Sequence, residues 1–70
     1  MDREIAIKNL AQAEQFVSLG LKHIADQELR VARLHGNDLA QAQNLLQTLK
    51  ETQVLHEEHR DQLRQELGWA

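Results

Sequence analysis

The residues best suited to chemistry stand together in the string His56-Glu57-Glu58-His59. Zinc metalloproteases carry His-Glu-x-x-His, in which the two histidines reach one metal ion from the same face of a helix. Here the histidines are three residues apart rather than four, and the string supplies no third ligand. His56 and His59 are therefore candidate metal ligands, with His23 as a third donor across a dimer, but partly buried structural histidines are the favoured interpretation. A pH-responsive interface is the third possibility.

Other catalytic patterns are missing from the sequence. Di-iron bundles need Glu-x-x-His on two helices, whereas Gln53 stands three residues before His56, and His56 itself stands three before His59. Ser18 is the only serine, and there is no cysteine and no glycine-rich phosphate loop. We therefore predict no catalytic residue, no cofactor and no enzymatic activity.

Charge and composition restrict the partners. Eight Lys and Arg residues face eleven Asp and Glu residues, a net charge of -3, and the basic residues are dispersed along the chain. Nucleic-acid binding needs a concentrated basic face, so it is disfavoured. No apolar run approaches the ~20 residues of a membrane span, and the polar start Met1-Asp2-Arg3-Glu4 does not resemble a secretory signal. A cytoplasmic location is expected, without membrane or nucleic-acid partners.

The elements that would position these residues are helices. Proline is absent, strong helix formers dominate, and apolar residues recur every three or four positions from the start of the chain. This period predicts a helix over about 3–34, with Asp2 as its N-cap. The positions predicted to form its buried seam are Ala6, Leu10, Ala13, Val17, Gly20, Ile24, Gln27, Val31 and Leu34.

A short turn and a second helix follow. In His35-Gly36-Asn37-Asp38, Gly36 suits a left-handed residue and Asp38 an N-cap, so a second helix is predicted over about 39–67, with Gly68 ending it. So short a connection folds the helices back on each other. Residues 1–70 are thus predicted to form one all-α domain, an antiparallel two-helix hairpin. Its second seam consists of Leu39, Ala42, Leu46, Leu49, Gln53, His56, Arg60, Leu63 and Leu67.

Two features of the seam leave alternatives open. Gly20 either breaks the first helix, giving a three-helix bundle, or lets a continuous helix approach its neighbour closely; we expect the second because the period continues across it. Polar residues at seam positions 27, 53, 56 and 60 indicate either a wet seam towards the open end of the hairpin, with Arg60 reaching Glu14, or residues that fix register and partner.

Both helices carry more apolar surface than one seam uses. A second stripe on each is what a four-helix bundle requires, so we expect the hairpin to dimerise. The residues predicted to form the oligomer interface are Phe16, Leu19, His23, Leu45, Thr52 and Leu55. The expected function is a non-catalytic protein-protein interaction or structural module that self-associates through helix faces, with an unidentified protein as a possible further partner. The alternative is a small regulatory or sensor protein that uses His56 and His59 for metal binding or pH response.

The chain also resembles a group of proteins across most of residues 10–67. The stretches that carry the likeness are His23-Ile24-Ala25, Val31-Ala32-Arg33-Leu34, Leu45-Leu46, Glu51-Thr52-Gln53 and His59-Arg60-Asp61-Gln62-Leu63. They are similar to uncharacterised short helical-hairpin proteins of proteobacteria, which often have Gly-His-Asp where this chain has Gly36-Asn37-Asp38. The resemblance implies a bacterial source and the same hairpin, and no activity.

Overall fold

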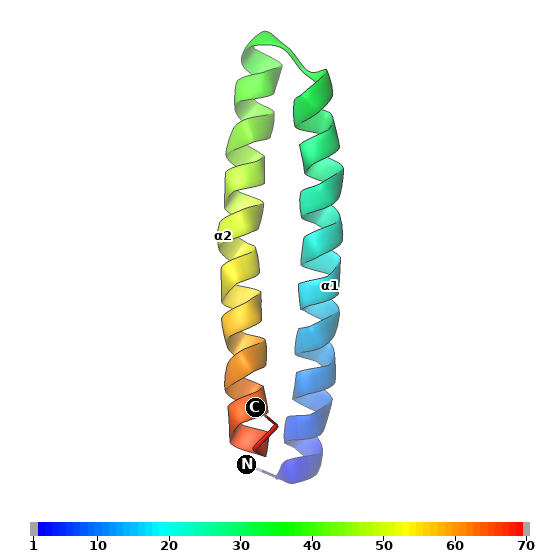
Figure 1. The fold of residues 1–70 in the computed structure, drawn as a ribbon, viewed down its shortest axis with the longest axis vertical. Coiled ribbons are helices and arrows are strands. Elements are labelled where there is room, and N and C mark those ends of the chain that lie inside the picture. Colours follow the sequence, from blue (N-terminus) through cyan, green and yellow to red (C-terminus); the bar gives the residue numbers. More distant parts are fainter. Residues whose placement is uncertain (1, 70) are drawn as a thin grey trace.

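Two long antiparallel helices make up the fold. In the computed structural model, which describes residues 2–69, α1 spans Arg3–Arg33 and α2 spans Gly36–Leu67. They lie side by side along their whole length, with both ends of the chain at the same end of the molecule (Figure 1). The hairpin measures 51 × 16 × 14 Å, so it is a slender rod. The predicted all-α hairpin is confirmed.

Helix α1 begins and continues as its sequence predicts. The carboxylate of Asp2 accepts a hydrogen bond from the backbone N–H of Glu4 at 3.1 Å, which satisfies one of the free donors at the helix start. The helix runs without a break through Gly20. The continuous-helix prediction is therefore confirmed, and the three-helix alternative is wrong.

The turn is tighter than expected. Helix α2 begins at Gly36, so Asp38 lies within its first turn, and the prediction that Asp38 is the N-cap is wrong. Gly36 has a φ of 64°, in the left-handed region, as its position predicted. This backbone conformation reverses the chain right after the extended Leu34 and His35, so helix α2 starts three residues earlier than predicted.

The far end of α2 closes with a glycine motif. Gly68 is left-handed, with a φ of 74°, and its N–H donates to the carbonyl of Gln65 at 3.0 Å. The N–H of Trp69 donates to the carbonyl of Arg64 at 2.7 Å. This pair of bonds is the Schellman arrangement, which satisfies carbonyls left free by the end of the helix. The prediction of Gly68 as the terminating residue is confirmed.

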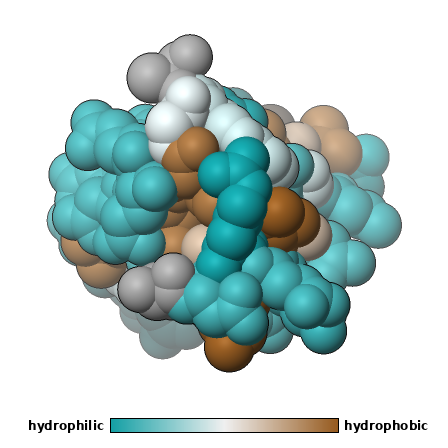
Figure 2. Space-filling view, turned by 90° about the horizontal axis from the view of Figure 1, so that it is seen from below, coloured by the Kyte–Doolittle hydropathy of each residue, from teal (hydrophilic) through white to brown (hydrophobic). Residues whose placement is uncertain are grey.

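The core is a single seam and is best packed near the chain ends. A cluster of buried residues there consists of Ala6, Leu10, Ala13, Leu63 and Leu67. Viewed along the helices from this end, hydrophobic residues lie between two largely hydrophilic masses (Figure 2). Towards the turn the seam is less covered, and Ile24, Leu46 and Leu49 are only half-buried. All the predicted seam positions are buried or half-buried.

Candidate interaction surface

One flank of the hairpin carries a shallow apolar groove. A depression at mid-length is lined by Phe16, Leu19 and His23 from α1 and by Leu49, Thr52 and His56 from α2, with Gly20 and Gln53 between them. Two further depressions continue towards the turn, and Leu45 lines both. We call this surface the groove face and define it by Phe16, Leu19, His23, Leu45, Leu49, Thr52 and His56.

The structure brings together five of the six residues predicted for an oligomer interface. Phe16, Leu19, His23 and Thr52 line the mid-length depression, and Leu45 lines the next one beside His23. Leu55 is not among the lining residues, and 64% of its surface is accessible. It lies one helical turn beyond Thr52, so it stands on the rim of the groove face rather than in the groove.

His56 belongs to this surface through an aromatic contact between the helices. Its ring stacks on that of Phe16, with centroids 5.8 Å apart and planes inclined by 28°. His56 is half-buried, whereas His59 is exposed. The two candidate metal ligands thus have different surroundings, because residues three apart on a helix point about 60° apart. Within residues 2–69 there is no group of three or more His, Asp or Glu side chains placed to hold a metal ion.

Two buried glutamines join the helices beneath the groove. The side-chain amide of Gln53 on α2 donates to the backbone carbonyl of Val17 on α1 at 2.9 Å. In the reverse direction, the amide of Gln27 on α1 donates to the carbonyl of Ala42 on α2, also at 2.9 Å. Both glutamines are at least 95% buried. The wet-seam interpretation is wrong for these two residues, since each one bonds to the backbone of the opposite helix.

The predicted ion pair across the seam is replaced by a neighbouring one. Arg60 binds its own neighbour Asp61 at 3.0 Å, and Arg64, one turn further along, reaches Glu14 at 3.5 Å. The expectation that Arg60 pairs with Glu14 is therefore wrong. Arg64 and Glu14 keep 41% and 49% of their side-chain surface accessible, so this pair contributes little to stability.

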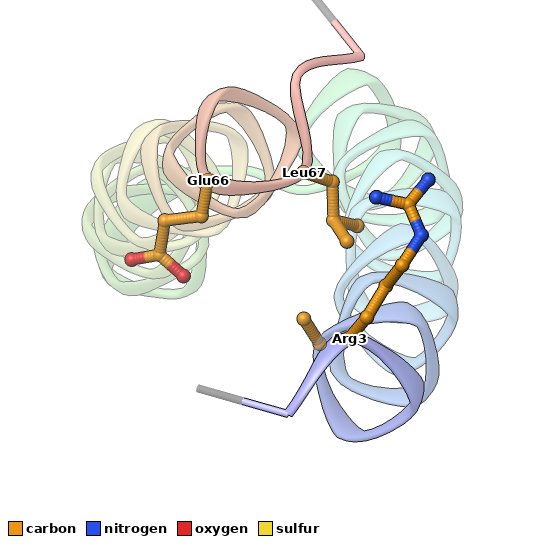
Figure 3. A pocket seen from close by; sticks show the side chains of 4 residues that line it. Arg3, Glu66 and Leu67 are labelled. Carbon is orange, nitrogen blue, oxygen red and sulfur yellow. The ribbon is translucent and has the colours of Figure 1, made fainter.

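A separate depression at the open end lacks convergent polar groups. Arg3, Ala6, Glu66 and Leu67 line it. The guanidinium of Arg3 and the carboxylate of Glu66 point away from each other, and Leu67 lies between them (Figure 3). Catalysis and small-molecule recognition need polar groups aimed at a common point. This depression does not provide them.

Sequence reasoning missed the part that Leu49 and His56 play in the groove. Both occupy seam positions in the heptad pattern, and both also line the mid-length depression. In a helical hairpin, one of the two seam rows of each helix borders an open flank, so its residues contact both the neighbouring helix and the groove. The signal was available in the position of Leu49 and His56 beside Leu45 and Thr52 on the helical wheel.

The search for a membrane-spanning helix and the comparisons with known proteins do not indicate a function. Over residues 2–69, neither helix combines the length and the apolar character needed to cross a bilayer. Comparisons with protein-family models, with curated proteins and with solved structures return no match. What this chain does must therefore be argued from its own surface.

Proposed function

We propose that this chain is a non-catalytic, cytoplasmic association module that pairs with a second copy of itself through the groove face to form a four-helix bundle. The main observation behind the proposal is that the groove lies beside the part of the seam whose residues are only half-buried. Phe16, Leu19 and Leu45 are exposed on the same flank where Leu49 is only half-buried. An apolar surface of this kind on a small protein indicates an interaction site.

The distribution of the core supports this proposal. The best-packed cluster lies near the chain ends. The rest of the seam has Val17 and Ala42 as buried apolar residues, with two buried glutamines and half-buried aliphatic residues beside them. Fully burying a Leu or Phe side chain contributes about 1.5–3 kcal/mol relative to leaving it in water. A second hairpin laid on the groove face would cover these residues and complete the core that a single seam leaves open.

The residues of the groove face do not favour a catalytic role. The groove is lined by one phenylalanine, two leucines, two histidines, one threonine, Gly20 and the buried Gln53, whose amide is already bonded to Val17. Among the described residues, no hydrogen bond joins the hydroxyl of Thr52 to His23 or His56. A role in association therefore fits the surface better than a role in catalysis.

Three leucines of similar exposure allow a sharp test. Leu19 lies on the groove face with 49% of its surface accessible, whereas Leu21 and Leu29 have 54% and 56% accessible and lie outside the groove. We expect Leu19→Glu to convert the dimer into a monomer in sedimentation equilibrium, with helicity retained at high protein concentration. Leu21→Glu and Leu29→Glu should remain dimeric. A wild-type chain that stays monomeric and fully helical at high micromolar concentration would refute the proposal.

A metal- or acid-responsive sensor is the second candidate. The observation that favours it is the position of His56 on Phe16, with His23 lining the same depression. The test compares helicity and oligomeric state with zinc, with nickel and with a chelator, and at pH 5 and pH 8. A shift in oligomeric state that His56→Gln removes would support the sensor. An unchanged dimer under all conditions would leave the plain association module.

A further inference from the structure

We infer that the second copy lies on the groove face with its turn at the same end of the bundle, related by a two-fold axis parallel to the helices. This inference rests on the proposed function and adds the orientation of the partner. In this arrangement, α1 of each copy packs against α2 of the other.

Two symmetric arrangements place the groove faces in contact with the helices of the two copies aligned. A two-fold axis lying in the interface runs either along the helices or across them, because closed dimers use the same surface on both copies. With the axis along the helices, the rotation leaves each residue at the same position along the long axis of the bundle, and both turns meet at one end. With the axis across the helices, α1 packs against α1 and α2 against α2, and each turn lies beside the chain ends of the other copy.

The register of the hairpin fixes which residues would meet. Gly20 lies opposite Gln53, and Phe16 lies opposite His56. Continued along both helices, this register places Arg33 near the height of Asp38, and Ile5 near the height of Trp69. With the axis along the helices, each of these α1 residues also lies opposite the same α2 residue of the second copy, for example Phe16 opposite His56.

Charge complementarity favours the axis along the helices. In that arrangement Arg30, which lines the depression nearest the turn together with Asp38, approaches Asp38 of the second copy. With the axis across the helices, Asp38 instead lies at about the height of Glu66 of the second copy, and Arg30 at about the height of Lys8, so like charges lie together, while Arg33 lies near Glu4. Juxtaposed like charges disfavour an interface, whereas opposite charges fix its register.

The exposed apolar residues at the rim lead to the same choice. Ile5 and Trp69 have 52% and 46% of their surface accessible. With the axis along the helices, Ile5 meets Trp69 of the second copy. Leu19 is covered by an apolar residue in either arrangement, by Leu55 with the axis along the helices and by Leu19 of the second copy with the axis across them. With the axis across the helices, Ile5 is placed against Arg33. The parallel axis therefore covers apolar residues with apolar residues.

A pair of spin labels separates the two arrangements. The chain has no cysteine, so Asn37→Cys at the exposed turn carries a single nitroxide per copy. Pulsed dipolar spectroscopy should give an inter-label distance of about 20–30 Å, since neighbouring helices in a bundle are about 10 Å apart and the two labelled α2 helices lie diagonally across it. With the axis across the helices, the two labels would lie nearly a full molecule apart, close to the 51 Å length of the hairpin.

A second label distinguishes failure of the orientation from failure of dimerisation. Ser18→Cys lies at the middle of α1 and is exposed, so its label gives a similar distance in both arrangements and reports association alone. Coupling at Ser18 together with a long distance at Asn37 would overturn the orientation and keep the dimer. No coupling at either position would overturn the dimer itself, and the orientation with it.

Discussion

The side chain of Gln53 occupies the space that a side chain at position 20 would need. A Cβ atom added to Gly20 would overlap Oε1 of Gln53, which is buried and has no hydrogen-bond donor among the described residues. The amide nitrogen of the same side chain donates to the carbonyl of Val17 at 2.9 Å. Gly20 is therefore present for close approach and not for helix bending, because α1 passes through it unbroken.

The first prediction concerns Gly20→Ala. In a helix interior this change normally stabilises by up to about 1 kcal/mol. Here the added methyl group displaces the buried amide of Gln53, and overpacking of this kind costs about 1–3 kcal/mol. We expect a net loss of stability of about 1 kcal/mol, measured as a lower urea midpoint with an unchanged slope.

The matched control is the same substitution in a Gln53→Ala background. With the amide removed, Gly20→Ala should be neutral or stabilising, and the double-mutant cycle should show a coupling of at least about 1 kcal/mol. If Gly20→Ala stabilises the otherwise unchanged chain, the close contact with Gln53 does not limit position 20.

The second prediction concerns Gln27. Its amide donates to the carbonyl of Ala42, which already accepts a bond within α2, so removing the amide leaves no acceptor stranded. Gln27→Met keeps the volume of the side chain and should change the free energy of unfolding by less than about 1 kcal/mol. Gln27→Ala leaves a void and should cost about 2 kcal/mol. Thermal and urea unfolding of the two variants provide the measurement, and equal losses would show that the hydrogen bond outweighs the packing.

The heptad period predicted which positions are buried, but not how the polar ones are satisfied. Leu10, Val17 and Leu63 lie in the seam as the period requires. The side-chain amide of a glutamine in a seam can hydrogen-bond to water or to the backbone of the opposite helix. Which of the two it does depends on the space left by the residue across from it. Gly20 opposite Gln53 is the sequence feature from which this contact could have been found.

Local ambiguity explains the remaining errors. Gly36, Asn37 and Asp38 are all acceptable at a helix start, and the left-handed backbone of Gly36 decides among them. Arg60 and Arg64 are one turn apart, and both side chains are long enough to approach the other helix, so spacing alone does not select the partner of Glu14. Such choices depend on backbone angles and rotamers that the residue types do not fix.

The third prediction uses the two left-handed glycines. Nothing lies within 4 Å of a Cβ added to Gly36 or Gly68, so their replacement tests the backbone conformation alone. Gly36→Ala and Gly68→Ala should each destabilise by about 1–2 kcal/mol, because a Cβ atom is strained at positive φ. Asparagine tolerates this region better, so Gly36→Asn should cost less than Gly36→Ala in urea unfolding. Equal costs for alanine and asparagine would point to a cause other than the φ angle.

The fourth prediction links stability to association. If folding and dimerisation are coupled, each tenfold rise in protein concentration should add about 1.4 kcal/mol to the free energy of unfolding per mole of dimer. The urea midpoint of the wild-type chain should therefore rise between micromolar and millimolar concentration. Leu19→Glu should unfold at a concentration-independent midpoint, because its charge prevents burial of the groove face. Leu29→Glu, outside the groove, should keep the wild-type dependence. A wild-type midpoint that does not move with concentration would mean that association adds nothing to the stability of the hairpin, and the exposed leucines of the groove face would then need another explanation.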